Sequence, residues 1–261
     1  LFILADDLGY SDLSCFGSPY IHTPNLDALA SEGMILTDFH SNCSVCSPTR
    51  VALMTGRYQH RTGIVNVLGQ TSKALPLIQG LPRSSTTLPE VLKEHGYQTA
   101  IFGKWHLGNF REFHPLEFGF DYFFGVSAGL VGDPFEYTYG KAGPNSRSTL
   151  YRNRERLEGR GEYITFRLAD ELLVYMNRMD REKPFFIYLP FTAPHLPYWK
   201  PGDSLVVWEG NPKGPHPDDL DAAYKATIEA LDLAVGNIMD KIRESGLGEN
   251  TLVFFTSDNG P

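Results

Sequence analysis

The run Leu1-Phe2-Ile3-Leu4-Ala5-Asp6-Asp7 is a continuous apolar stretch that ends in two adjacent acids. A strand that is apolar at every position is typical of a sheet that is covered on both faces. Similar apolar strands are predicted at residues 97–103, 184–191 and 251–256, and a helical pattern precedes each of them. The alternation predicts an α/β fold with a mostly parallel central sheet flanked by helices on both faces.

The helices are predicted from their end signals and their spacing. Thr23 and Pro24 are typical of an N-cap followed by a first-turn proline, and Gly33 terminates that segment. Thr87-Leu88-Pro89-Glu90 matches a capping box. The expected helices cover residues 23–33, 87–96, 162–181 and 218–246, whereas residues 125–147 and 200–217 are interpreted as long loops of the same domain.

Composition narrows the class of protein. The chain has 261 residues, of which 42% are hydrophobic and 21% charged, so it is expected to form one large globular unit. A net charge of -8 argues against a nucleic-acid-binding surface, which needs a basic face. No stretch approaches the roughly 18 apolar residues of a membrane span. Three cysteines do not make a disulfide framework, and an odd number leaves at least one unpaired.

Both ends of the chain fall next to strands. Residues 1–5 are interpreted as a core strand that is entered midway, and no export signal is visible at the start of the given sequence. The last residues, Asp258-Asn259-Gly260-Pro261, directly follow another strand. We therefore expect residues 1–261 to be one domain that is truncated at both ends.

Acidic side chains follow the first and the last predicted strands. Asp6 and Asp7 come after residues 2–5, and Asp258 and Asn259 come after residues 251–256. In open α/β sheets the ligand site lies beyond the carboxyl ends of the strands, so these side chains are expected to converge. Their oxygens suit a hard ion such as calcium or magnesium, whereas a zinc pattern of Cys and His is missing. The alternatives are a helix cap, a solvated loop or a simple turn.

Two further segments are expected at the same edge. Gly103-Lys104-Trp105-His106 and Thr192-Ala193-Pro194-His195 each follow a predicted strand and would bring cationic or proton-donating groups to the acids. Beside a metal ion, such groups suit a multiply charged oxyanion. The alternative is that Lys104 and His106 are surface charges and that Trp105 only packs.

The segment Cys46-Ser47-Pro48-Thr49-Arg50 begins another predicted helix, because Pro48 suits a first turn and no breaker follows before Gly56. Cys46 would then lie at a helix N-terminus, where free N–H groups favour an anion. The alternative is a buried cysteine that acts as a small hydrophobic residue.

Read with its continuation Val51-Ala52-Leu53-Met54-Thr55-Gly56-Arg57, this segment resembles the signature of the type I, formylglycine-dependent sulfatases, within the alkaline phosphatase superfamily. The other blocks occur in order along almost the whole chain. They are Ala5-Asp6-Asp7-Leu8-Gly9-Tyr10, Thr23-Pro24-Asn25-Leu26-Asp27, Gly103-Lys104-Trp105-His106-Leu107-Gly108, Pro194-His195 and Ser257-Asp258-Asn259-Gly260.

The resemblance implies a role for each matching residue. Asp6, Asp7, Asp258 and Asn259 would bind calcium, or less typically magnesium, together with Cys46 modified to formylglycine. Arg50 would hold the formylglycine, Lys104 and His195 would contact the sulfate, and His106 would orient the aldehyde hydrate. A further sulfate-contacting lysine and a C-terminal subdomain of the family would lie beyond this sequence.

The function implied by the resemblance is hydrolysis of sulfate esters, with sulfated carbohydrates or aryl sulfates as substrates. It also implies a formylglycine-generating maturation enzyme as a partner, and export to the periplasm, the lysosome or the extracellular space. Two alternatives stay open, a phosphate or phosphonate ester hydrolase and a non-catalytic module that binds anionic glycans. Loops at residues 64–86, 109–160 and 197–217 would set specificity, and Tyr137, Tyr139, Trp199 and Trp208 are candidates to stack on sugars.

Overall fold

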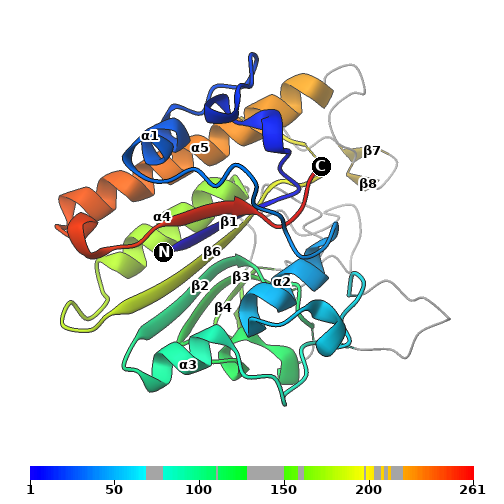
Figure 1. Cartoon of the computed structure of the whole chain (residues 1–261), viewed down its shortest axis with the longest axis vertical. Coiled ribbons are helices and arrows are strands. Elements are labelled where there is room, and N and C mark those ends of the chain that lie inside the picture. Colours follow the sequence, from blue (N-terminus) through cyan, green and yellow to red (C-terminus); the bar gives the residue numbers. More distant parts are fainter. Residues whose placement is uncertain are drawn as a thin grey trace.

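A seven-stranded sheet forms the centre of the computed structural model (Figure 1). The structure describes residues 1–68, 79–109, 111–127, 150–157, 162–196, 198–202, 207–208, 211–212 and 220–261. In spatial order the strands of the sheet are β5 (Glu155–Arg156), β4 (Leu150–Arg152), β3 (Tyr122–Val126), β2 (Gln98–Lys104), β6 (Phe185–Pro194), β1 (Phe2–Asp6) and β9 (Phe254–Ser257).

The sheet is mostly parallel, as the sequence predicts. Strands β3, β2, β6, β1 and β9 run parallel, with Phe2 opposite Tyr188 of β6 and Phe254 of β9. At the other edge of this sheet, β4 pairs antiparallel with both β3 and β5. The carboxyl ends of β1, β2, β6 and β9 therefore meet along one side of the sheet.

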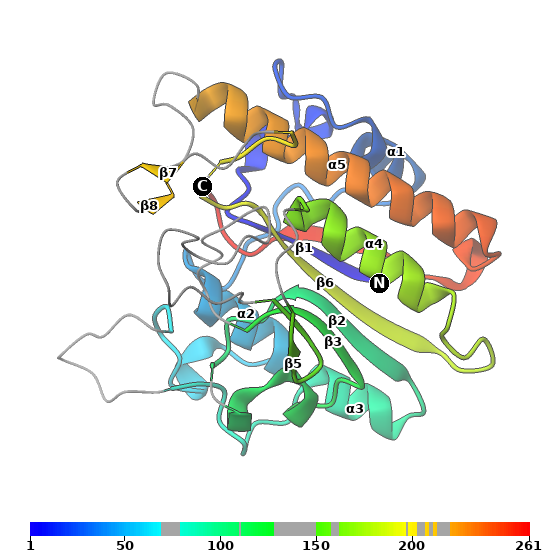
Figure 2. The ribbon, with the colours of Figure 1, turned by 180° about the vertical axis from the view of Figure 1, so that it is seen from behind.

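Helices cover both faces of the sheet (Figures 1 and 2). Helices α1 (Pro24–Glu32), α4 (Ile164–Met176) and α5 (Leu220–Glu244) lie on one face, and α2 (Cys46–Thr55) and α3 (Leu88–Glu94) on the other. Short 3-10 helices and a separate two-stranded ribbon complete the elements: η1 (Tyr10–Asp12), η2 (Ser14–Phe16), η3 (Gln59–Arg61), η4 (Arg111–Phe113), η5 (Pro115–Glu117), η7 (Gly248–Asn250), β7 (Val207–Trp208) and β8 (Asn211–Pro212). Among the described residues, no helix combines the length and the apolar character needed to cross a bilayer.

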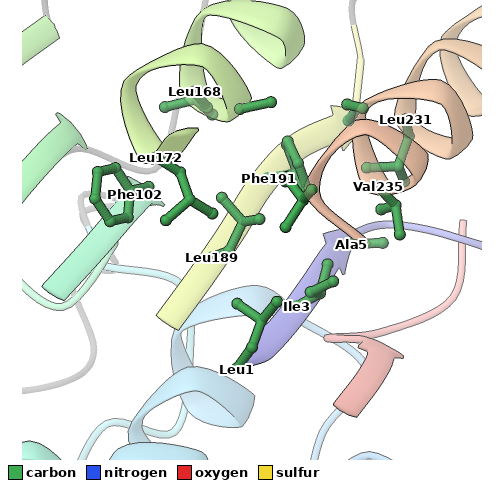
Figure 3. Close-up of a cluster of buried hydrophobic side chains, with 14 of the residues drawn as sticks. Leu1, Ile3, Ala5, Phe102, Leu168, Leu172, Leu189, Phe191, Leu231 and Val235 are labelled. Carbon is green, nitrogen blue, oxygen red and sulfur yellow. The ribbon is translucent and has the colours of Figure 1, made fainter. Parts of the chain in front are cut away.

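Two hydrophobic cores form because the strands are apolar on both faces. On β1, Ile3 and Ala5 point to the layer of α4 and α5, where they pack with Leu189 and Val235 (Figure 3). Leu4 points the other way. It belongs to the second core, whose fully buried members include Val51, Ile101, Trp105, Phe118, Phe123 and Tyr188.

A side chain from α5 caps helix α1. Thr23 makes no capping hydrogen bond at the N-terminus of α1. Instead, the carboxylate of Asp232 accepts from the backbone N–H of Leu26 at 2.8 Å and from the side-chain Nδ2 of Asn25 at 2.7 Å. A carboxylate is favourable at this end of a helix. The long-range cap therefore fixes α1 against α5.

The structure corrects several predicted boundaries. The helix expected at residues 162–181 is shorter, the strand expected to end at Phe191 extends to Pro194, and the strand expected at residues 251–256 is shifted to Phe254–Ser257. The segment 109–160 is not only loop, because it supplies β3, β4 and β5. The segment 197–217 contains β7 and β8, while Tyr137 and Tyr139 lie outside the described residues.

Glycines allow three strands to approach closely just before Lys104. A Cβ atom on Gly103 would lie 1.8 Å from the carbonyl oxygen of Pro190 in β6, and one on Gly125 would lie 2.0 Å from the carbonyl oxygen of Gly103. Gly103 also has a φ of 134°, which residues with side chains rarely adopt. The backbones of β2, β3 and β6 therefore fit together only with glycine at these positions.

Candidate active site

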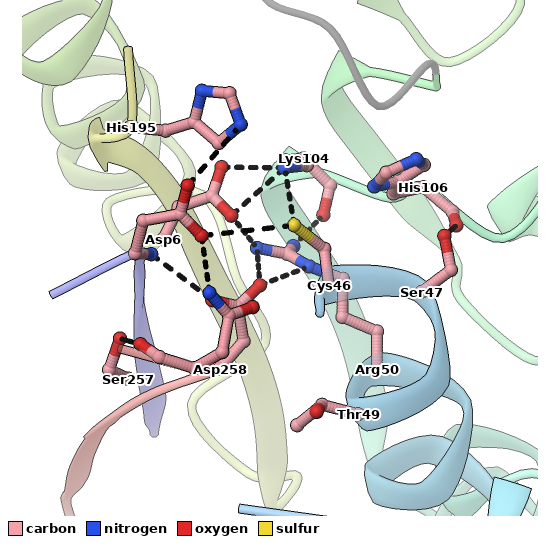
Figure 4. Close-up of polar contacts among 12 residues, drawn as sticks. Asp6, Cys46, Ser47, Thr49, Arg50, Lys104, His106, His195, Ser257 and Asp258 are labelled. Atoms are coloured by element: carbon pink, nitrogen blue, oxygen red, sulfur yellow. Dashed lines mark hydrogen bonds and ion pairs between the residues drawn. The ribbon is translucent and has the colours of Figure 1, made fainter. Parts of the chain in front are cut away.

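The polar residues singled out in the sequence converge at the carboxyl ends of the strands (Figure 4). Asp6 ends β1, Lys104 ends β2, His195 follows β6, and Asp258 follows β9. Helix α2 begins at Cys46, so its N-terminus faces the same edge. Its N-cap residue, Val45, makes no side-chain cap, which leaves backbone N–H groups at this end free of a capping side chain.

Arg50 is the centre of a buried ion-pair network. Its Nε and one terminal nitrogen contact Oδ2 of Asp258 at 2.9 and 2.8 Å. The same terminal nitrogen lies 3.1 Å from Oδ1 of Asp6, and the other donates to the backbone carbonyl of Lys104 at 2.7 Å. Arg50 and Asp258 are 0% exposed and Asp6 is 1% exposed, so water screens none of these charges.

Lys104 extends this network to Cys46. Its Nζ contacts both oxygens of Asp6, at 2.9 and 2.7 Å, and lies 3.4 Å from the Sγ atom of Cys46. Lys104 is 0% exposed. The sequence-based alternative of a surface charge is therefore wrong for Lys104, which is the last residue of β2 and part of the interior.

Asp7 lies on the outer side of the cluster that Asp6, Cys46, Arg50, Lys104 and Asp258 form. One carboxylate oxygen accepts from Nδ2 of Asn259 and lies 4.0 Å from Sγ of Cys46, and the other lies 3.4 Å from Nε2 of His195. Asp7 has a φ of 63°, a left-handed backbone conformation that costs about 1–3 kcal/mol outside glycine. This cost indicates that the surrounding contacts hold Asp7 in place.

His106 lies beside the cluster and is almost completely buried. Its Nε2 is 3.3 Å from the carbonyl oxygen of Leu68, while its Nδ1 is buried without a partner among the described residues. Burial, reinforced by the charges of Lys104 and Arg50, lowers the pKa of His106 to about 2. The imidazole is therefore neutral, and His106 is not the surface charge that the sequence left open.

Burial and, to a smaller extent, the neighbouring charges determine the protonation of the Cys46 thiol. Burial raises the pKa of the Cys46 thiol to about 12, and the carboxylates of Asp6 and Asp258 add to this effect against Lys104 and Arg50. The unmodified thiol is thus protonated near neutral pH. Burial also favours a neutral Asp6, but the positive charges of Lys104 and Arg50 outweigh it and hold the pKa of that carboxyl below its usual range.

The arrangement fits a hard divalent cation. Asp6, Asp7, Asp258 and Cys46 each offer one ligand atom, and these four atoms lie within 4.8 Å of one another. Oδ1 of Asn259 is buried and has no hydrogen-bond partner among the described residues. A buried amide oxygen is costly unless a donor or cation meets it, and oxygen donors are those calcium and magnesium prefer. Within the part of the chain that the structure describes, the carboxylates of Asp6, Asp7 and Asp258 share two fixed cations, Arg50 and Lys104.

Sequence reasoning missed some residues that shape this edge. Ser257 lies within a quoted block, yet only the structure indicates its role, since its Oγ accepts from the backbone N–H of Leu8 at 2.9 Å. Ser47 donates to the carbonyl oxygen of His106 at 3.0 Å and so ties α2 to that residue. Their positions directly next to Asp258 and Cys46 are the only sequence signal for them.

The aromatic candidates for sugar stacking receive no support from the described residues. Trp199 is 3% exposed and packs in a small core with Tyr163 and Ala230, so it is not free to stack on a ligand.

All three cysteines, Cys15, Cys43 and Cys46, are free thiols.

Comparisons with known proteins find relatives along the whole chain. The family model described as Sulfatase matches residues 1–261. Human N-acetylgalactosamine-6-sulfatase is 35% identical over 274 residues, covering 100% of this chain and 49% of that protein. Mouse arylsulfatase G is 36% identical over 287 residues, covering 99% and 50%. The chain thus spans about half the length of the curated relatives it matches.

A solved structure supports the same relationship. The crystal structure of Ps i-CgsB in complex with k-i-k-neocarrahexaose superimposes with a TM-score of 0.80 at 29% identity, covering 99% of this chain and 58% of that one. The resemblance therefore extends from the motifs to the whole fold.

Proposed function

Because this chain belongs to the sulfatase family, we propose that residues 1–261 form the catalytic domain of an enzyme that hydrolyses sulfate esters. The observation that carries the proposal is the convergence of Cys46, Arg50, Lys104 and three carboxylates at one buried edge of the sheet. The nucleophile would be formylglycine made from Cys46 by a formylglycine-generating maturation enzyme, so the Sγ atom stands where an aldehyde hydrate oxygen would lie.

A modified residue explains how turnover is completed. One hydroxyl of the hydrate loses its proton and attacks the sulfur atom, the bond from sulfur to the ester oxygen breaks, and the leaving oxygen takes up a proton to give the alcohol. The remaining hydroxyl then loses its proton as the sulfated hydrate collapses to the aldehyde and releases sulfate, and addition of water to the aldehyde restores the hydrate. A cysteine or serine could form the first adduct but could not expel sulfate in this way, and it would remain blocked.

The fixed charges of the chain suit this reaction. Lys104 and the N-terminus of α2 would stabilise negative charge on the sulfuryl oxygens, and Arg50 would hold formylglycine and the acids in place. Neutral His106, whose buried Nδ1 has no hydrogen-bond partner among the described residues, would orient the hydrate. His195 faces Asp7 at the outer side of the cluster and would contact the sulfate. A histidine there is also suited to transfer the leaving-group proton.

Calcium, with magnesium as the less favoured ion, would be held by Asp6, Asp7, Asp258, Asn259 and modified Cys46. When bound, the ion would polarise the sulfate oxygens and offset the negative charge of the carboxylates. Lys104 engages both oxygens of Asp6, so this carboxylate would be shared between the lysine and the ion.

The proposed substrates are sulfate esters of carbohydrates. The name N-acetylgalactosamine-6-sulfatase and the carrahexaose complex of Ps i-CgsB support this class, although each describes its own protein. By the same resemblance we expect the protein to be exported to the periplasm, the lysosome or the extracellular space.

The proposal is tested by comparing ester classes with the mature full-length protein. We expect turnover of sulfate monoesters to exceed that of matched phosphate and phosphonate monoesters, and peptide mass spectrometry to find formylglycine at position 46. Faster phosphate or phosphonate turnover would instead identify an ester hydrolase of the alternative class. Glycan binding without turnover, with Cys46 unmodified, would support the non-catalytic alternative.

Lys104 offers a prediction about catalysis. Lys104→Ala is expected to lower kcat for a sulfate ester by about a hundredfold or more, with a smaller change in KM, because a preorganised charge matters most when charge develops in the transition state. Lys93→Ala is a suitable control, since Lys93 is exposed and forms an ion pair with Asp121 at the surface. Wild-type kcat in a variant with normal formylglycine content would contradict this role.

A further inference from the structure

Three consecutive backbone N–H groups after β1 are each held by a side-chain oxygen. The N–H of Asp7 donates to Oδ1 of Asp258 at 3.2 Å, and that of Leu8 donates to Oγ of Ser257 at 2.9 Å. The third, from Gly9, donates to Oδ2 of Asp12 at 3.1 Å. The first two acceptors are the residue after β9 and the last residue of β9, but Asp12 is a separate contact from η1.

Asp12 is itself fixed by a distant helix. The hydroxyl of Tyr224 in α5 donates to the same oxygen, Oδ2 of Asp12, at 2.5 Å. Tyr198 packs against Tyr224 with ring centroids 4.9 Å apart. Burial and the neighbouring carboxylate of Asp12 raise the pKa of Tyr224, so its hydroxyl keeps the proton that it donates. The contact therefore links α5 to the backbone next to Asp7.

The space around Gly9 leaves room for the Asp12 carboxylate at the backbone. A Cβ atom on Gly9 would lie 2.3 Å from Oδ2 of Asp12, so only glycine lets this carboxylate approach the backbone so closely. The φ of Gly9 is -72°, which any residue can adopt. Glycine is thus required here for close approach and not for its conformational freedom.

We propose that Asp12 and Tyr224 are positioning residues for the metal ligand Asp7. Asp7 is held with a φ of 63°, and its neighbours Leu8 and Gly9 must stay in place for its carboxylate to face Cys46 and His195. The Asp12–Tyr224 pair anchors the far end of this short segment. The inference rests on the proposed metal site, because it assigns the pair a role in metal affinity.

The test compares calcium affinity with the stability of the metal-free protein. In full-length protein, Tyr224→Phe and Asp12→Ala are each expected to weaken calcium binding, measured by calorimetric titration, by about tenfold or more, the usual effect of removing an outer contact that orients a ligand. Asp12→Asn keeps an acceptor for Gly9 and Tyr224 and is expected to restore most of the affinity. Tyr175→Phe is the matched control, since its half-buried hydroxyl makes no hydrogen bond with another described residue.

Amide hydrogen exchange, measured with a chelator present to keep the protein free of metal, tests the same contact without calcium. The Gly9 amide is expected to exchange about tenfold faster or more in Asp12→Ala, the scale of losing one hydrogen bond, while the thermal midpoint of the metal-free protein stays near that of Tyr175→Phe. Unchanged calcium affinity in Tyr224→Phe and Asp12→Ala would overturn the proposal, as would a loss of affinity that only follows a loss of fold. If the wild-type protein binds no calcium but still hydrolyses sulfate esters, the metal role of the pair is overturned while the proposed activity stands.

Discussion

Cys46→Ala in the mature full-length protein is expected to lower sulfate ester turnover by about 10⁴-fold or more, the scale of removing a covalent nucleophile. Alanine keeps the helix start of α2 and the surrounding ion pairs of Arg50, so the fold should persist. Cys43→Ala is the matched control, since Cys43 is a partly buried cysteine three residues upstream that makes no contact with the cluster among the described residues.

Cys46→Ser separates nucleophilic attack from turnover. A serine hydroxyl at this position can accept the sulfuryl group, but it has no second hydroxyl with which to expel sulfate. We expect mass spectrometry of the incubated variant to find a residue heavier by one SO₃ group at position 46, without continued turnover. Steady turnover by either Cys46 variant would contradict the assignment of Cys46 as the nucleophile.

The sequence predicted the sheet and the meeting of its strand ends because those features have local signals. Continuous apolar runs identify strands β1, β2 and β6, and end signals identify α1 and α3. Strand β3 was not predicted, and residues 125–147, which begin at Gly125 within that strand, were interpreted as a long loop. The structure indicates that this glycine is needed for the close approach of the backbone to Gly103.

Contacts between distant residues account for what the sequence did not predict at the site. Lys104 was expected to follow a strand, with a surface charge as the alternative, yet it is fully buried against Asp6, 98 positions away. Tyr224 lies 212 positions from Asp12 and carries no local signal. Such pairs are set by tertiary packing, and no spacing rule within one sequence reveals them.

The effect of Arg50 on stability follows from the same buried network. Arg50→Ala is expected to lower the free energy of unfolding by about 3–5 kcal/mol, because it leaves the carboxylates of Asp6 and Asp258 short of a buried partner. Arg50→Lys should recover only part of this loss, since one ammonium group cannot reproduce contacts with Asp258, Asp6 and the carbonyl oxygen of Lys104. Urea denaturation measures both variants, and Arg61→Ala, at an exposed position, is the control.

The dependence of this loss on pH identifies its cause. Without the Arg50 charge, the pKa of Asp6 in the folded protein rises toward or above its unfolded value, so the folded state binds more protons than the wild-type folded state does. The difference in the free energy of unfolding between wild type and Arg50→Ala is then largest near neutral pH. It becomes smaller as the pH falls and the carboxyl groups become neutral. A deficit that is the same at pH values above and below the usual carboxyl range would indicate lost packing rather than lost charge. In that case Arg50 would stabilise the site through the volume of its side chain and not through its ion pairs.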